Sequence, residues 1–136
     1  MPSSWILKTE PSTYSYDDLE RDRTTVWDGV KNPLALKHIG QMQSGDEVLI
    51  YHTGAEKAVV GRAEVVGAPY PDPKLKEPKR LVVELRAIGR LPGPVTLAQI
   101  KADPVFKDLA LVRMGRLSVV PATAAHRKRL LQLAKA

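Results

Sequence analysis

The chain has 136 residues, 43% hydrophobic and 26% charged, a composition typical of one compact domain, residues 1–136, rather than a disordered segment. It contains no cysteine, which excludes disulfides, thiolate metal sites and cysteine nucleophiles and favours a cytoplasmic location. A net charge of +6, from 21 basic and 15 acidic residues, favours a polyanionic partner such as nucleic acid.

The beginning of the chain predicts two strands separated by a helix. Side chains that favour β-structure fill residues 4–9 and 24–27, and Pro11 ends the first of these runs. Ser15 and Asp18 have the spacing of a capping box, which predicts that a short helix begins there.

The middle of the chain predicts a second helix and two further strands. Asn32 precedes a proline, and this pair predicts a helix that reaches Gln41, because asparagine caps free amides and proline fits the first turn. Residues 47–52 predict a strand with both faces partly buried, as in a closed barrel. Residues 58–66 predict another apolar strand, with a bulge or tight bend at Gly61.

The second half begins with a long loop, because residues 68–79 hold four prolines and show no periodicity. Residues 80–91 alternate as a strand does, and residues 117–120 predict a last strand. Thr96 and Thr123 are expected to cap two more helices. Five or six strands with interspersed short helices predict an α+β fold built on a small barrel.

The sequence lacks the motifs of common enzymes and metal sites. Its three histidines, His38, His52 and His126, lie in different predicted elements without the spacing of a zinc site. We therefore expect no catalytic residues, no metal and no cofactor. No apolar run approaches the roughly 20 residues of a membrane-spanning helix, so no membrane partner is expected.

The two tryptophans are of interest because aromatic residues make up only 5% of the chain. Trp27 is followed by Asp28, Gly29 and Asn32, so a flat stacking face lies beside hydrogen-bonding groups, as a pocket for a nucleic-acid base requires. Trp5 and Trp27 are also consistent with core positions in which the indole N–H is satisfied.

Five segments follow the order found in the EVE domain family and together span nearly the whole chain. They are residues 5–11, residues 27–32, Gly45-Asp46 leading to Tyr51-His52, residues 70–72 and residues 116–119. The chain therefore resembles this family. The resemblance implies a PUA-like pseudo-barrel flanked by helices, related to the YTH domain, and a role as a reader of modified cytosine or another modified base in DNA or RNA.

Carried over position by position, the resemblance implies a pocket that receives a flipped-out base. The implied pocket residues are Trp27, Asp28, Asn32, Tyr51, His52 and Ser118. Trp27 would be a wall, Asn32 a partner of the base edge or backbone, and Ser118 would close the cavity. His52 is equally consistent with a half-buried histidine whose ring nitrogens are both satisfied.

A second group is expected at the pocket rim or on phosphates. It comprises Lys8, Glu10, Lys31, Tyr70, Arg113 and Arg116. Lys31 departs from the family, which more often has arginine there; lysine keeps the charge but loses the planar fork. Lys8 and Glu10 share a strand face, and a surface ion pair explains them as well as a pocket border does. Arg113 and Arg116 are likewise consistent with an ordinary solvent-exposed turn that contacts no phosphate.

The leading hypothesis is a module that binds nucleic acid and holds an extruded, modified base against Trp27. One alternative is a protein-interaction module with a basic surface. Another is an enzyme in which Lys8, Glu10, Asp28 and His52 supply acid and base. A separate nuclease or restriction enzyme is a further expected partner.

Overall fold

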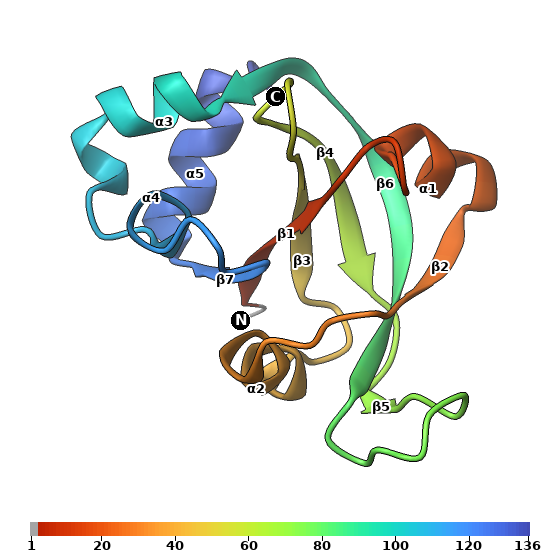
Figure 1. Ribbon diagram of the computed structural model, residues 1–136. Helices are drawn as coiled ribbons and strands as arrows, with labels where there is room; N and C mark the ends of the chain where they lie inside the picture. The colour runs from red at the N-terminus through yellow and green to blue at the C-terminus, as the bar shows by residue number, and fades with distance from the viewer. Residues whose placement is uncertain (1–2) are drawn as a thin grey trace.

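The computed structural model describes residues 3–136, which form one curved, mixed sheet with helices around it (Figure 1). The strands are β1 (Ser4–Thr9), β2 (Thr24–Trp27), β3 (Glu47–His52), β4 (Ala58–Val65), β5 (Tyr70–Pro71), β6 (Leu81–Thr96) and β7 (Val119–Ala122). The helices are α1 (Tyr16–Asp22), α2 (Pro33–Gln41), α3 (Leu97–Ala102), the 3-10 helix η1 (Pro104–Phe106), α4 (Ala110–Arg113) and α5 (Ala124–Leu133).

The seven strands follow the order β2-β6-β4-β3-β1-β7, and β5 pairs with β6 off this path. β1 is parallel to β3, and the remaining pairs are antiparallel. In Figure 1, α3, α4 and α5 gather beside β1 and β7, whereas α1 and β2 lie on the opposite side. The expected α+β class is confirmed; the sheet path is open, with β2 and β7 at its ends.

The predicted helix starts are confirmed because each has the expected side-chain cap. The Oγ of Ser15 accepts from the amide of Asp18, and Oδ1 of Asn32 accepts from the amide of Ala35. Thr96 and Thr123 begin α3 and α5 with reciprocal capping boxes. Capping is a local interaction, so these boundaries could be located from the sequence alone.

β6 is longer than predicted, because it continues through Thr96 although prolines follow Leu91. The register between β4 and β6 passes from Gly61↔Arg90 directly to Val59↔Val95. Residues 91–94 therefore bulge out of the ladder, where proline needs no amide hydrogen to donate.

Three other elements differ from the prediction. The loop expected over residues 68–79 contains β5, which raises the strand count to seven. The last strand begins at Val119 instead of residue 117 and ends at Ala122. η1 and α4 are not predicted, because single turns of helix are too short to show a hydrophobic period.

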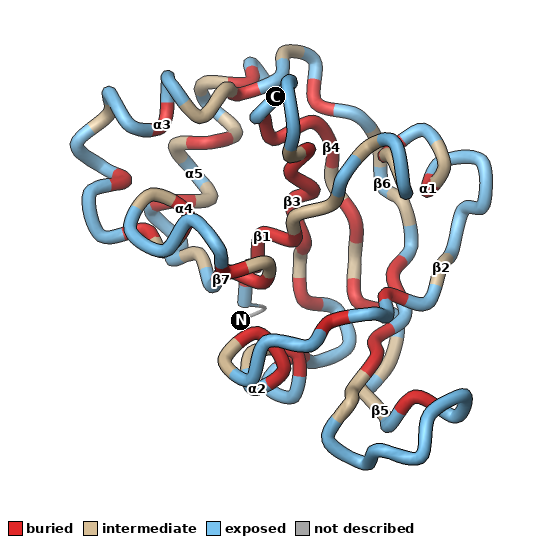
Figure 2. The backbone as a smooth tube through the Cα atoms, viewed as in Figure 1, coloured by how far each residue is buried: buried red, intermediate tan, exposed pale blue. Residues whose placement is uncertain are grey.

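Burial follows the central strands. Figure 2 shows buried backbone along β1, β3 and β4, whereas β2 and the loop after β5 are largely exposed. Ile6, Leu49 and Val59 are fully buried at the centre of the sheet. Within residues 3–136, no helix has the length and apolarity that crossing a membrane requires.

Candidate functional site

A cleft of about 590 Å³ opens between the end of β1, the turn that follows it, and the segment from β2 to α2. Its lining combines aromatic, apolar, hydroxyl and charged side chains. The lining residues are Lys8, Thr9, Glu10, Thr13, Tyr14, Thr25, Val26, Trp27, Asp28, Gly29, Val30, Lys31 and Ser118. We call this cavity the Trp27 cleft.

An aromatic pair forms one wall of the Trp27 cleft. The rings of Tyr14 and Trp27 meet edge to face, with centroids 6.2 Å apart and an interplanar angle of 84°. The Tyr14 hydroxyl donates to a carboxylate oxygen of Asp22, which fixes the tyrosine ring. The indole N–H of Trp27 has no acceptor among residues 3–136, so this wall retains an unused donor.

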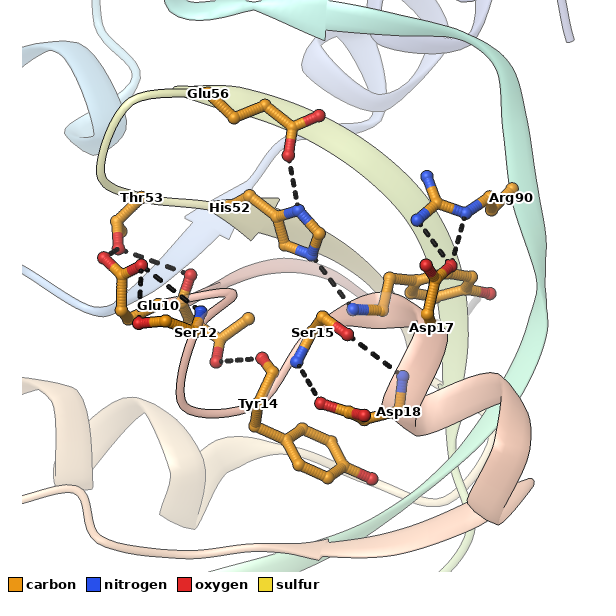
Figure 3. A network of polar contacts seen from close by, with 12 residues as sticks. Glu10, Ser12, Tyr14, Ser15, Asp17, Asp18, His52, Thr53, Glu56 and Arg90 are labelled. Atoms are coloured by element: carbon orange, nitrogen blue, oxygen red, sulfur yellow. Dashed lines mark hydrogen bonds and ion pairs between the residues drawn. The ribbon is translucent and has the colours of Figure 1, made fainter.

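The turn after β1, which carries Tyr14, forms a second part of the border. The amides of Thr13 and Tyr14 both donate to the carbonyl of Glu10, and the Thr9 hydroxyl donates to the carbonyl of Tyr14. The Glu10 carboxylate accepts from Ser12 and from the hydroxyl of Thr53 (Figure 3). The carboxylate is therefore held in place at the mouth of the cleft.

Lys8 does not form the expected ion pair with Glu10; no such pair occurs within residues 3–136. Its Nζ instead donates to the carbonyl of Gly115 at 2.8 Å, and its backbone amide donates to the carbonyl of Ser118. Burial lowers the pKa of the Lys8 ammonium. Lys8 thus borders the cleft, and within residues 3–136 its ammonium has no carboxylate to neutralise it.

The segment from Asp28 to Lys31 closes the cleft on the α2 side. Gly29 has a φ of +76°, a left-handed conformation that glycine adopts without a steric penalty. The carbonyl of Val30 accepts a hydrogen bond from Nε of Arg80 at 3.1 Å. This bond ties the cleft wall to the loop between β5 and β6.

The structure brings together six of the twelve predicted site residues. They are Lys8, Glu10, Trp27, Asp28, Lys31 and Ser118. These residues come from the end of β1, from β2 and the segment after it, and from the position before β7, and they line one cleft although β2 and β7 are at opposite ends of the strand order. That these residues contact a base or a phosphate stays a prediction.

His52 is not part of the Trp27 cleft. Its Nε2 accepts from the amide of Tyr16, and its Nδ1 lies 2.7 Å from Oε1 of Glu56 (Figure 3). The side chain is only 4% exposed. His52 therefore joins the start of α1 to the β3–β4 turn, which is the structural interpretation that the sequence left open.

Asn32 and Tyr51 are also displaced from the expected pocket. Asn32 uses its side-chain oxygen to cap α2 and does not line the cleft. Tyr51 lies on the other side of Lys8, whose Nζ is 5.9 Å from the tyrosine ring centroid. The position of Tyr51 could not be predicted from the sequence, because the alternation of side chains along a strand does not reveal which way the sheet curls.

The remaining predicted rim residues lie elsewhere. Tyr70 is on β5, with its hydroxyl 3.5 Å from Oε1 of Glu84. Arg113 donates to the carbonyl of Lys107, and Arg116 is exposed; neither lines the Trp27 cleft.

Seven lining residues are absent from the predicted site: Thr9, Thr13, Tyr14, Thr25, Val26, Gly29 and Val30. The scarcity of aromatic residues was a usable signal for Tyr14, as it was for Trp27. Nothing in the sequence shows that the turn after β1 folds against β2. Among residues 3–136, no three histidine, cysteine, aspartate or glutamate side chains group as a metal site.

Comparison with known proteins agrees with this architecture. The EVE domain family matches residues 3–133. Human thymocyte nuclear protein 1 is 27% identical over 157 residues, covering 90% of this chain and 70% of that protein.

Two solved structures share the fold over nearly the whole chain. Protein Rpa0253 from Rhodopseudomonas palustris is 37% identical, with a TM-score of 0.93 over 98% of this chain and 93% of that one. The human THYN1 protein in complex with DNA containing 5-methylcytosine is 26% identical, with a TM-score of 0.90 over 98% of each chain. The resemblance found in the sequence is confirmed, and the chain belongs to the EVE domain family.

Proposed function

We propose that the protein binds DNA carrying a modified base and that this base enters the Trp27 cleft. The observation that carries the proposal is the fold shared with the human THYN1 protein, whose structure contains 5-methylcytosine DNA. The cleft supports it, because about 590 Å³ lies within the usual range for small-ligand sites of roughly 300–1,000 Å³.

The lining can recognise a cytosine by three kinds of contact. The ring stacks on the aromatic wall formed by Tyr14 and Trp27. The carboxylate of Asp28 accepts from the exocyclic amine, as acidic side chains do with cytosine. Val26 and Val30 supply apolar surface for a methyl group, and burying one adds about 0.8 kcal/mol.

The base must leave its stack to reach the cleft. Extrusion from a duplex costs a few kcal/mol, so single-stranded or mismatched sites bind more tightly than intact duplex. The net charge of +6 strengthens this binding through the phosphates without adding base selectivity. RNA with the same base, a separate nuclease partner and a cytoplasmic location stay predictions from the sequence.

We also infer that the protein returns its ligand unchanged. The acid–base group considered from the sequence does not assemble, because both ring nitrogens of His52 are engaged away from the cleft. Mass spectrometry of the modified oligonucleotide after prolonged incubation checks this: the mass stays constant, and any new product would overturn the inference.

The test is a fluorescence anisotropy titration with single strands that differ in one base: cytosine, 5-methylcytosine, 5-hydroxymethylcytosine, adenine or N6-methyladenine. Wild type binds one modified strand most tightly, Trp27→Ala loses the preference, and Tyr70→Ala, an aromatic control outside the cleft, keeps it. A folded Trp27→Ala that still discriminates would refute base capture in the cleft. Uniform binding that salt abolishes would instead support the interaction-module alternative.

A further inference from the structure

A second cavity, of about 230 Å³, lies on the other side of Lys8 from the Trp27 cleft. It is bordered by the β3–β4 turn, α3, α4 and the turn before β7. Its lining residues are Lys8, Tyr51, Thr53, Gly54, Lys57, Leu97, Lys101, Leu111, Val112 and Gly115. We call it the lysine cleft, because three of its lining residues are lysines and none is acidic.

The three lysines of this cleft are not neutralised within the described chain. In residues 3–136 the ion pairs are made by arginines and by His52, and none involves Lys8, Lys57 or Lys101. The Glu10 carboxylate, which contacts the lining residue Thr53, accepts hydrogen bonds from Thr53 and Ser12 and pairs with none of the three lysines. The cavity is therefore a concentration of unpaired positive charge.

One uncommitted hydroxyl accompanies the charges, because that of Thr53 donates to Glu10 and to the carbonyl of Thr9. Tyr51 is nearly buried, and its hydroxyl makes no hydrogen bond within residues 3–136. Burial raises the pKa of this phenol, so it stays a neutral donor. Ammonium and hydroxyl donors around a small cavity match the oxygens of a phosphate group.

Lys57 is held at the cleft by an uncommon backbone conformation. Its φ is +46°, in the left-handed region where side chains other than glycine and asparagine are rare. The carbonyl of Lys57 accepts from the amide of Leu97 at 2.8 Å, which fixes this turn against the start of α3. Lys57 therefore occupies a position at which glycine would adopt the same backbone conformation with less strain.

We propose that the lysine cleft binds a backbone phosphate of the strand whose base occupies the Trp27 cleft. Lys8 lines both cavities, so a base and an adjoining phosphate have contiguous sites. This inference rests on the proposed function and adds the ligand group that the second cleft receives. Free inorganic phosphate has the same chemistry, and the experiment separates the two sources.

The main test compares Lys57→Gly with Lys135→Gly. Lys135 also has a positive φ, of +59°, is exposed and lies outside both clefts, so the two substitutions remove the same charge and relieve the same backbone strain. Binding of single-stranded DNA is measured at several salt concentrations for each variant.

Loss of one phosphate contact lowers the slope of log affinity against log salt by about 0.7 for a single strand. We expect this decrease in Lys57→Gly, with modified and unmodified strands weakened by the same factor, and an unchanged slope in Lys135→Gly. If the two variants had the same salt slope, the lysine-cleft proposal would be overturned.

A second measurement separates this proposal from the base-capture function. Inorganic phosphate is titrated at constant ionic strength against chloride, and the amide signals of Lys57 and Lys101 are followed by NMR. Shifts specific to phosphate support the anion site even if no base preference is found. If wild type prefers a modified base but Lys57→Gly keeps the full salt slope, base capture stands and the phosphate site is refuted. Tighter binding of free phosphate than of a dinucleotide would overturn the assignment to a backbone phosphate.

Discussion

Trp5 and Trp27 are almost equally buried, at 5% and 9% exposure, yet their indole N–H groups have different surroundings. That of Trp5 donates to Oδ2 of Asp46 at 3.0 Å, and Asp46 also accepts from the amides of Ser3 and Gln43. That of Trp27 has no acceptor within residues 3–136 and lies in a cleft wall. Exposure alone does not distinguish these two tryptophans, whereas the hydrogen bonding of their indole N–H groups does.

The largest expected difference is in stability. Trp5→Ala should lower the free energy of unfolding by about 3–5 kcal/mol, because it leaves a cavity and removes a buried hydrogen bond. Trp27→Ala should cost less, since one side of that ring faces the cleft rather than packed core. Urea unfolding of both variants measures the difference. Equal losses of unfolding free energy would contradict the distinction drawn between the two tryptophans.

A closely packed position on β4 should tolerate less added volume than the cleft wall does. A Cβ at Gly61 would lie 2.5 Å from ring atoms of Tyr16, which is fully buried. We expect Gly61→Ala to lower the free energy of unfolding by about 1–3 kcal/mol through overpacking. Thermal or urea unfolding measures this loss.

Two glycines serve as controls for that substitution. Gly29→Ala in the cleft wall has open space around its Cβ, so only the left-handed backbone opposes it, at about 1–2 kcal/mol. Gly67→Ala meets neither obstacle and should change stability by less than about 0.5 kcal/mol. A Gly61→Ala protein as stable as Gly67→Ala would show that the Tyr16 ring can move aside.

The smallest expected effect is the pH dependence contributed by Glu47, which follows Asp46, the acceptor of the Trp5 indole N–H. Burial alone would raise its pKa, but hydrogen bonds from Arg127 and Arg62 outweigh burial and hold the pKa below its usual value. A lowered pKa in the folded state gives stability that is present above the unfolded pKa and lost as the pH falls through the folded one.

Glu47 should therefore contribute about 1 kcal/mol or less, complete above about pH 5.5 and declining below about pH 4. Unfolding free energies of wild type and Glu47→Gln, measured across this range, should converge at low pH. Glu77→Gln, at an exposed ion pair, should follow wild type throughout. If the difference in unfolding free energy between wild type and Glu47→Gln widened on acidification, the lowered pKa assigned to Glu47 would be contradicted.

Local signals in the sequence predicted much of the fold and part of the site. Capping residues such as Ser15 and Asn32 mark helix starts because the interaction spans only three residues. β6 extends past its prolines because a bulge removes the need for their amides, and this depends on pairing with β4. Tyr51 and His52 pair with Lys8 and Thr9 of the cleft but do not line it themselves. Which neighbours their side chains meet depends on the fold around the strand, so the sequence pattern did not show it.

The most direct measurement of the central claim uses the two indole N–H signals in a ¹H–¹⁵N spectrum, one for each tryptophan, assigned with Trp27→Phe. On titration with a single strand containing 5-methylcytosine, we predict that the Trp27 signal shifts and the Trp5 signal stays in place, with a smaller Trp27 shift for the unmodified strand. A stationary Trp27 signal on binding, or equal shifts for both strands, would contradict capture of a modified base in the Trp27 cleft.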